Sequence, residues 1–448
     1  MTLTDLSRQE IIDVSHDTTL YEWAVQSAIK PLVVDRAKGI YFWDVDGKRY
    51  IDFNSQLMCV NVGHGDERVI AAIKAQLDQI AYIAPTLATT PARAELGRLL
   101  KQITPKNMGK AFFTNGGAEA NENAVKIARW YTGRHKILAR YRAYHGATAA
   151  AIALTGDPRR WAAEPGIPGV VRIPDFYPYR AGADQDDPAY TAAVLNATEE
   201  IIEFEGPQTI AGILIETVVG TNGLLIPSAA YIRGLRDLCT KYGILLICDE
   251  IMSGFGRTGA WFAVDHWGVE PDIITMAKGL TSAYVPLGAT MVSQPIADFF
   301  EDRPLQAGLT YNSHPVGCAA AIACINIYKE DRLIENAKAM GEIVKAEFAR
   351  MKANHPSVGD TRAIGLFSLL ELIKNRETRE PMTPYNPKPS ELGPMPAFGA
   401  YLREHGLFTF VRWNTVFVNP PLCINEEQLR KGLAIIDQAL EITDKAVA

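Results

Sequence analysis

Three apolar runs in the middle of the sequence each end on a polar residue, and this arrangement limits the possible folds more than any other feature. The runs GILIE, ILLICD and IITMAK end at Glu216, Asp249 and Lys278, so the end residues lie 33 and 29 positions apart. A strand, a crossover and the next parallel strand need about 30 residues or more. Successive parallel strands would therefore place these three side chains at one edge of a sheet, where open α/β folds bind ligands.

From about residue 111 onward, the sequence alternates short apolar runs with helical stretches, as βαβ units do. The segment GFGRTGAWFAVDHWGVEP, between two of the runs, is the exception because it lacks a helical pattern. Earlier, residues 67–80 place Val69, Ile73, Leu77 and Ile80 on one helical face. A further helix is predicted to begin at Thr90-Pro91, a cap followed by proline at the first helical position.

The two ends of the chain differ from this middle part. GIYFWDVDGKRYIDF predicts a hairpin around Asp46-Gly47, and the C-terminal part combines a long helical region with the Pro-rich PMTPYNPKPSELGPMP. A Pro-rich loop of this length is either a flexible cover or a functional lid. We predict an N-terminal arm and hairpin over 1–70, a large domain over 71–325 and a C-terminal small domain over 326–448, with the first and last forming one small unit.

Composition excludes several classes of protein. The 448 residues carry 51 acidic and 45 basic side chains, a net charge of -6, which argues against a nucleic acid or an anionic membrane as the main partner. The N-terminus lacks the apolar core of a signal peptide, and no uncharged apolar run approaches the ~18 residues of a membrane span. Six cysteines without a CxxC pair and eight histidines without metal-ligand spacing predict reduced core thiols, no metal and a cytoplasmic protein.

Lys278 is the candidate nucleophile. An amine that leaves water loses solvation, so its charged form is disfavoured and its pKa falls, in extreme cases by ~3–5 units. The neutral amine attacks carbonyl groups and forms Schiff bases. The alternative is a lysine that passes the edge of the sheet and extends into solvent.

A glycine loop supplies a candidate anion site. FFTNGGAEANENAVKIARW predicts a strand, then Gly116, Gly117 and Ala118, then a helix that begins near Glu119. Small residues at a helix N-terminus leave backbone N–H groups free to approach a phosphate, although Gly-Gly also forms ordinary turns. GFGRTG at 254–259 matches a dinucleotide motif, but no helix follows it and no acidic residue ends a strand ~20 residues later, so we reject that interpretation.

These motifs together resemble the class III pyridoxal-phosphate aminotransferases, the ω-aminotransferase group of fold type I, over nearly the whole chain. The matching stretches also include VNVGHG, YHGAT, ETVVGTNG, CDEIMSGFGRTG, TYNSHP and VNPPL. The resemblance implies a mostly parallel seven-stranded sheet with helices on both faces, a smaller α+β domain, and pyridoxal 5'-phosphate as cofactor bound by the large domain.

The resemblance also implies roles for individual residues. Lys278 would form the Schiff base and move the proton, and Asp249 would keep the pyridine nitrogen protonated so that the ring accepts electrons. The implied cofactor-binding positions are Gly116, Gly117, Ala118, Tyr144, His145, Glu216, Asp249, Ile251, Lys278 and Thr310. Thr310 would reach the cofactor of a neighbouring subunit, which implies a homodimer with shared active sites; a tetramer stays open.

The substrates are less constrained. Arg412 matches an arginine that binds the acceptor carboxylate, while Trp23, Leu57 and Met58 match donor-pocket positions. Thr221 stands where relatives that use 2-oxoglutarate carry a glutamate, which favours pyruvate as the acceptor. The stretches NGGAEANEN and TGDPRRW are similar to those of taurine:pyruvate enzymes, so taurine and β-alanine are candidate donors.

We therefore expect an aminotransferase acting on an ω-amino acid or amine with a 2-oxo acid, most simply pyruvate. The alternatives are use of 2-oxoglutarate, or an aminomutase or racemase on the same frame. From other classes, a silent binding or scaffold protein and an NAD-dependent oxidoreductase remain, and both would lack the colour of the pyridoxal cofactor.

Overall fold

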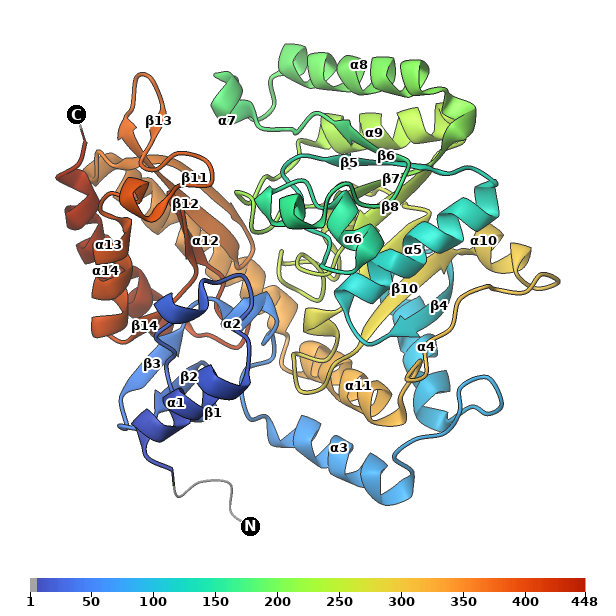
Figure 1. Cartoon of the computed structure of the whole chain (residues 1–448), viewed down its shortest axis with the longest axis horizontal. Helices are drawn as coiled ribbons and strands as arrows, with labels where there is room; N and C mark the ends of the chain where they lie inside the picture. The colour runs from blue at the N-terminus through green and yellow to red at the C-terminus, as the bar shows by residue number, and fades with distance from the viewer. Residues whose placement is uncertain (1–5, 448) are drawn as a thin grey trace.

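A seven-stranded sheet forms the centre of the computed structural model, which describes residues 6–447 (Figure 1). Its strand order is β4-β10-β9-β8-β7-β5-β6; β10 is antiparallel to both neighbours and every other adjacent pair is parallel. The mostly parallel seven-stranded sheet is therefore confirmed. The strands are β4 (Met108–Thr114), β5 (Lys136–Arg140), β6 (Val170–Ile173), β7 (Ile210–Glu216), β8 (Leu245–Asp249), β9 (Ile273–Met276) and β10 (Gly288–Ser293).

Helices cover both faces of this sheet, as its sequence pattern requires. All seven residues of β7 are buried. Ile213 and Ile215 belong to the core cluster that contains α9 (Ala229–Tyr242), whereas Leu214 belongs to the cluster that contains α5 (Gly117–Thr132). Because successive strand side chains point to opposite faces, a strand covered on both sides is apolar throughout rather than alternating.

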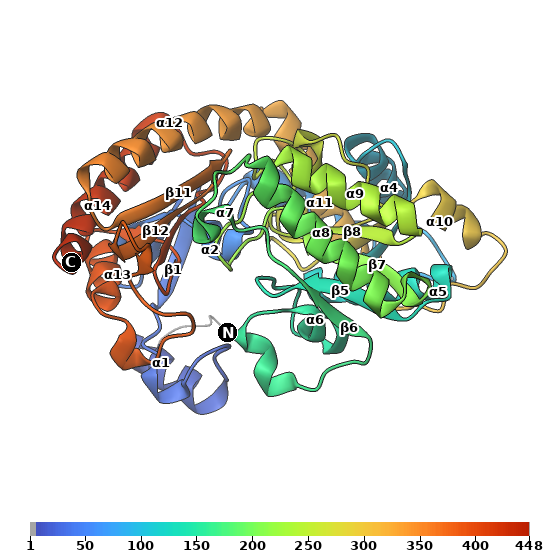
Figure 2. The ribbon, with the colours of Figure 1, turned by 90° about the horizontal axis from the view of Figure 1, so that it is seen from above.

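A smaller part lies beside the sheet and joins the two ends of the chain (Figure 2). The predicted hairpin forms β2 (Tyr41–Asp44) and β3 (Arg49–Asp52), which with β1 (Val34–Lys38) and β14 (Leu407–Phe408) make a sheet in the order β1-β2-β3-β14. A second sheet contains β11 (Val358–Ile364), β12 (Phe367–Asn375), β16 (Thr415–Val418) and β15 (Val411–Arg412), with β13 (Glu380–Pro381) paired to β12. N- and C-terminal segments therefore share a sheet, while the exact boundaries at 70 and 325 stay a prediction.

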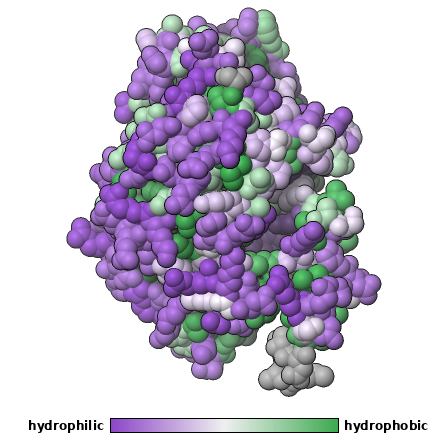
Figure 3. All heavy atoms as spheres, turned by 90° about the vertical axis from the view of Figure 1, so that its left-hand side faces the viewer, coloured by the Kyte–Doolittle hydropathy of each residue, from purple (hydrophilic) through white to green (hydrophobic). Residues whose placement is uncertain are grey.

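The remaining helices surround these sheets. They are α1 (Arg8–Thr18), α2 (Ser55–Met58), α3 (Glu67–Gln79), α4 (Pro91–Ile103), α6 (Ala149–Leu154), α7 (Pro178–Ala181), α8 (Pro188–Glu205), α10 (Gln294–Phe299), α11 (Pro315–Glu330), α12 (Leu333–Asn354), α13 (Met395–Glu404) and α14 (Glu426–Asp444). The side of the molecule that carries α13 and α14 is largely hydrophilic (Figure 3). Among the helices of residues 6–447, none is long and apolar enough to cross a membrane.

Helix α4 begins where its sequence predicted, because the Thr90 hydroxyl accepts a hydrogen bond from the backbone N–H of Arg93 at 3.2 Å. Helix α3 shows the limit of periodicity. Val69 is fully buried, but Leu77 and Ile80, on the same predicted face, are 51% and 38% exposed.

The crossover between β8 and β9 contains turns and a short 3-10 helix, Ala263–His266, instead of an α-helix. Its GFGRTG segment packs against the small part of the molecule. The buried guanidinium of Arg257 donates to the carbonyls of Leu366 at 3.0 Å and Pro420 at 2.6 Å, and to the Ser55 hydroxyl at 2.9 Å. This glycine-rich segment is therefore occupied by contacts within the chain.

Candidate active site

The three strand-end residues lie at one edge of the central sheet. Glu216 is paired in register with Asp249, and Asp249 with Thr275, on the parallel strands β7, β8 and β9. Lys278 follows β9 by two residues and begins a short 3-10 helix. The chain thus carries two carboxylates and one amine to the carboxyl end of the sheet.

The Asp249 carboxylate is fixed from three directions. Its Oδ2 accepts hydrogen bonds from Asn121 Nδ2 and His145 Nδ1, both at 2.8 Å, and its Oδ1 accepts from the Ile251 backbone N–H at 3.0 Å. Thr275 Oγ1 donates to Asn121 Oδ1 at 2.7 Å, so the amide of Asn121 presents its donor to Asp249. Asp249 is only 4% exposed, and an ionised carboxylate in this setting is held in one orientation.

Burial lowers the pKa of the Lys278 amine, and the nearby charge of Arg159 lowers it further, against the opposing charges of Cys59, Asp249 and Glu216. The residue keeps part of its surface accessible even though its amine is surrounded by protein. Its φ of 40° lies in the left-handed region, which is strained for a residue other than glycine. Burial thus favours the neutral, nucleophilic form of this amine, and the strained backbone at Lys278 fixes where its side chain begins.

The N-terminus of α5 is open to an anion. Gly116 is the N-cap residue and supplies no side-chain hydrogen bond, which leaves the first N–H groups of this 16-residue helix free of side-chain caps. A Cβ at Gly117 would lie 2.8 Å from the end of the Ile251 side chain, so a larger residue there would displace Ile251. The cradle therefore borders Ile251, two residues beyond Asp249.

Tyr144 and Glu216 form the opposite wall. The Tyr144 backbone N–H donates to Glu216 Oε1 at 3.0 Å, and the Gly220 N–H donates to Oε2 at 2.8 Å. Burial raises the pKa of Glu216, and the charge of Asp249 acts in the same direction. The Tyr144 ring is met edge-on by Trp23, with 6.3 Å between centroids.

Two arginines share one aspartate at the mouth of this site. Arg159 Nη2 lies 2.5 Å and Arg412 Nη2 3.3 Å from the same oxygen, Oδ2 of the fully buried Asp157. Arg159 also donates to Thr221 Oγ1 at 3.0 Å, and its guanidinium lies 3.6 Å from the centroid of the Tyr144 ring. Burial and the neighbouring charge of Arg159 lower the pKa of Arg412 to about 10.

The other residues expected at the site are arranged less closely. Trp23 is 54% and Leu57 57% exposed, whereas Met58 is 3% exposed and part of the main core. Thr310 is exposed, and its carbonyl accepts a hydrogen bond from Tyr82 at 2.8 Å. In residues 6–447, no hydrogen bond joins Thr310 to the residues around Asp249, and no cluster of three or more potential metal ligands occurs.

Sequence reasoning missed three residues of the site. Asn121 lies on the buried side of α5, where a polar residue needs a partner, and this was its only signal. Asp157 and Arg159 stand in TGDPRRW, a stretch that sequence comparison singles out without assigning roles to its residues.

Known proteins are similar to this chain over most of its length. The model of the class III aminotransferase family matches residues 23–440. The chain belongs to the class III aminotransferases. As a member, it is a pyridoxal-phosphate-dependent enzyme, and the open α5 N-terminus, the fixed carboxylate and the low-pKa amine all fit that cofactor.

The aminotransferase resembles relatives with different substrates. A taurine:2-oxoglutarate aminotransferase from Bifidobacterium kashiwanohense, solved in complex with the cofactor and glutamate, is 41% identical with a TM-score of 0.96, covering 100% of both chains. Putrescine–pyruvate aminotransferase of Pseudomonas aeruginosa is 32% identical over 93% of this chain and 91% of that protein. Mitochondrial gamma-aminobutyrate transaminase 1 of Oryza sativa subsp. japonica is also 32% identical, over 94% and 83% respectively.

Proposed function

We propose that Lys278 and Asp249 are the catalytic residues of this aminotransferase. The observation that carries the proposal is a buried amine with a lowered pKa beside an oriented carboxylate at the end of the sheet. The bound cofactor supplies an aldehyde that links covalently to an amine and a ring that withdraws electrons. Lys278 would hold the cofactor and would move the proton at the substrate carbon, and Asp249 would keep a proton on the ring nitrogen.

The remaining cofactor contacts follow from the positions around this pair. The N–H groups at Gly116, Gly117 and Ala118, which have no side-chain cap, would hold the phosphate, and Ile251 and Tyr144 would hold the ring. His145 donates to Asp249 from one side, and this bond stabilises the ionised carboxylate. Glu216 holds the backbone at Tyr144 and Gly220 and so sets the width of the site.

The donor we propose is a short ω-amino acid or aminosulfonate, with taurine and β-alanine as candidates. Arg159 and Arg412 place two positive charges against the single charge of Asp157, so the mouth of the site carries an unbalanced cation. A planar guanidinium binds carboxylate and sulfonate groups through paired N–H donors. Arg159 binds the acidic end of the donor, Arg412 the carboxylate of the acceptor, and Trp23, Leu57 and Met58 border the donor chain.

The acceptor is a 2-oxo acid. Pyruvate is favoured by Thr221, which occupies the position of an acidic residue in relatives that use 2-oxoglutarate. Thr221 accepts a hydrogen bond from Arg159, so position 221 adds no second carboxylate to the pairing of Arg159 with Asp157. The same excess of positive charge favours a dicarboxylic acceptor as the second candidate, which the 41% identical taurine:2-oxoglutarate enzyme also supports.

We propose a homodimer in which Thr310 reaches the cofactor phosphate of the other subunit. Thr310 is exposed and bonded to Tyr82 within an apolar surface of one subunit. Burying such a surface in a second copy removes it from water. The exposed apolar side chains are Leu77, Ile80, Tyr82, Ile83, Leu87 and Tyr311.

We also propose the cytoplasm as the compartment of this protein, since all six cysteines are free thiols.

Three measurements test this function. Borohydride reduction of the coloured enzyme should fix the cofactor on the peptide that contains Lys278, as seen by mass spectrometry, and Lys278→Ala should abolish both labelling and turnover. Taurine, β-alanine and putrescine are then assayed with pyruvate and with 2-oxoglutarate, with alanine or glutamate as the product. Arg159→Met should weaken the binding of taurine and β-alanine and leave the binding of putrescine unchanged. Arg159→Lys should retain part of the binding of the two acidic donors. Label on another lysine, or no amino acid product from any pair, contradicts the proposal.

A further inference from the structure

A second pocket lies directly behind the two arginines. It has a volume of about 190 Å³, and its lining includes Thr221, Asn222 and Trp413. Thr221 is the residue that accepts the hydrogen bond from Arg159, and the Trp413 ring lies 4.4 Å from the guanidinium of Arg412. The pocket therefore shares one wall with the proposed substrate-binding arginines.

Asn222 points to a ligand in this pocket. The side chain is only 3% exposed, and neither its amide nitrogen nor its amide oxygen has a hydrogen-bond partner among the described residues. Buried amides are normally satisfied, because a buried donor without an acceptor loses its hydration and gains nothing in exchange. A polar group bound in the pocket would give the Asn222 side chain the hydrogen-bond partners that it lacks.

Arg142 supplies a charge to the same pocket. Its guanidinium lies between the rings of Tyr177 and Tyr385, 4.9 Å and 5.5 Å from their centroids. Only its backbone N–H contacts a carboxylate, Oδ1 of Asp175 at 2.9 Å, and no carboxylate in residues 6–447 lies within ion-pair distance of the guanidinium. Stacking between two rings fixes its plane and leaves its N–H edge available to an anion.

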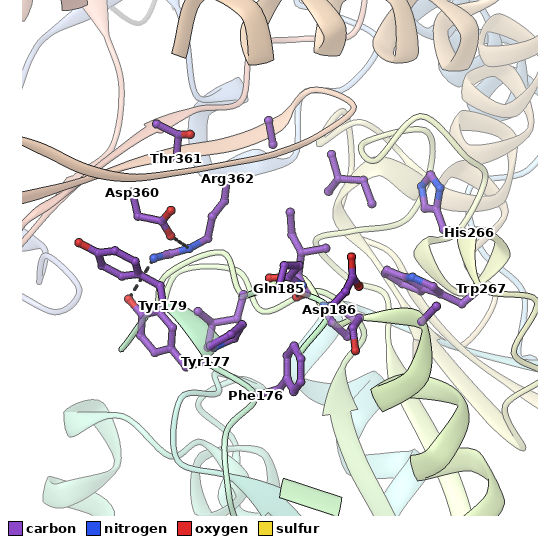
Figure 4. Close-up of a pocket in the computed structure, with 18 of the residues that line it drawn as sticks. Phe176, Tyr177, Tyr179, Gln185, Asp186, His266, Trp267, Asp360, Thr361 and Arg362 are labelled. Carbon is purple, nitrogen blue, oxygen red and sulfur yellow. Dashed lines mark hydrogen bonds and ion pairs between the residues drawn. The ribbon is translucent and has the colours of Figure 1, made fainter. Parts of the chain in front are cut away.

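The one carboxylate in the lining is already neutralised. Glu371 accepts hydrogen bonds from the Tyr177 hydroxyl, Arg180 and Arg362. Although burial opposes it, the charges of Arg362 and Arg180 lower the pKa of Glu371 to about 2. Figure 4 shows the far side of this wall, where Arg362 is joined to Asp360 and Tyr177. Two guanidinium groups and one carboxylate thus line the pocket, which favours an anion.

The Pro-rich segment forms part of the cover. Pro381, Thr383 and Tyr385 line the pocket, and the Tyr385 ring packs against Trp413 with 4.7 Å between centroids. Tyr385 therefore contacts the residue next to Arg412 on one side and the Arg142 guanidinium on the other. A segment that the sequence leaves as either a flexible cover or a lid has a defined place over this pocket.

We propose that this pocket, between Arg142 and Asn222 under Tyr385, is the subsite for the distal carboxylate of a dicarboxylic 2-oxo acid. The inference rests on the proposed function and specifies the acceptor class of that site. Pyruvate has no distal acid group and leaves the subsite empty. A free inorganic oxyanion such as sulfate offers the same chemistry and is the other source of an occupant.

The test compares two acceptors in one half of the reaction. Enzyme loaded with the amino group by a donor is mixed with 2-oxoglutarate or with pyruvate, and the half-saturating concentration of each is measured. Arg142→Met should raise the value for 2-oxoglutarate by about 10- to 100-fold, the effect of losing hydrogen bonds to a charged group, and change that for pyruvate less than about twofold. The half-saturating concentration of 2-oxoglutarate for Arg142→Lys should fall between those of the wild type and Arg142→Met. Asn222→Ala should also raise this concentration, by a smaller factor.

Pyruvate turnover and cofactor absorbance show that each variant is folded. If the half-saturating concentration of 2-oxoglutarate is unchanged in Arg142→Met, or rises equally for both acceptors, the proposed subsite is wrong. Sulfate that competes with pyruvate and 2-oxoglutarate alike in the wild type, but with neither in Arg142→Met, assigns the pocket to a free oxyanion and also overturns it.

A binding measurement separates failure of the subsite from failure of the proposed function. Glutarate, an unreactive dicarboxylate, is titrated into the holoenzyme by calorimetry, with propionate as the monocarboxylate control. Glutarate should bind about tenfold or more weakly to Arg142→Met than to the wild type, with propionate unchanged. This result supports the subsite even if no donor and acceptor pair gives turnover, whereas equal glutarate binding overturns it.

Discussion

The two sides of the active site differ in how completely their charges are paired. On the side of Asp249, both carboxylate oxygens accept hydrogen bonds, from Asn121 of α5, His145 in the loop after β5 and Ile251 in the turn after β8. On the opposite side, Arg159 and Arg412 share a single oxygen of Asp157, and Arg412 Nε has no partner among the described residues. The Asp249 oxygens are both paired within the chain, although His145 Nε2 has no partner among the described residues, whereas the two arginines have N–H donors left over.

The difference follows from what each side has to hold. One cofactor stays bound through every cycle, so a carboxylate fixed in advance loses no orientation when it is needed. A donor and an acceptor alternate on the other side, and a fully paired arginine would have no donors to offer to either. We therefore expect substitutions on the Asp249 side to affect all substrates equally, and those on the arginine side to act selectively.

The largest effect should come from Asp249→Asn. This change keeps the size of the side chain and removes the charge that we propose pairs with the ring nitrogen. Breaking a buried pair costs about 3–5 kcal/mol, so kcat/KM should fall about 10²- to 10⁴-fold for every donor. Steady-state assays with taurine and putrescine check this, and a loss confined to one donor would remove the distinction between the two sides.

The next effect concerns Asn121, which orients that carboxylate. Asn121→Ala removes a hydrogen bond to a charged acceptor, about 1.5–3 kcal/mol, so kcat/KM should fall about 10- to 100-fold without a change in donor preference. Thr275→Val is the matched control, because it removes only the bond that fixes the amide of Asn121 and should cost about fivefold. If Thr275→Val is as severe as Asn121→Ala, the effect comes from packing.

A smaller and selective effect is expected at Tyr144. Tyr144→Leu removes the ring face 3.6 Å from the guanidinium of Arg159, a contact that contributes about 0.5–2 kcal/mol. The KM of acidic donors should therefore rise about 2- to 30-fold more than that of putrescine. Tyr144→Phe keeps the ring and should match the wild type. An equal change for the acidic donors and for putrescine would show that Tyr144 does not act through Arg159.

The smallest expected effect is a shift along the pH axis. Burial lowers the pKa of Lys278 from its ordinary value of 10.5, so the neutral amine is present at a lower pH than in an exposed lysine. The rate at which cofactor-free enzyme recaptures pyridoxal 5'-phosphate should rise with pH and reach half its maximum below 10.5. Visible absorbance measures the rate, and a midpoint at the ordinary value or above contradicts the buried amine.

Features that depend on neighbours in the chain were predicted well. Thr90 caps α4 by accepting a hydrogen bond from the backbone N–H of Arg93, three positions along the chain. The spacing of Glu216, Asp249 and Lys278 identified the ends of three parallel strands. Periodicity predicted α3 but not its burial: Leu77 is exposed on the helix that holds the buried Val69, and the exposed Ile80 lies just past the end of that helix. A helical pattern shows which residues share a face, but not what covers it.

The sequence by itself determined the parallel sheet, the glycine loop before α5 and the amine at the strand end, because these follow from apolar periods, glycine positions and the length of a crossover. Only the tertiary structure decided the partners of the charged groups. Asn121 meets Asp249 across 128 positions, and Arg412 meets Asp157 across 255. No local pattern selects such a partner, because the hydrogen bond forms between groups that are brought together only when the sheet and the small domain pack.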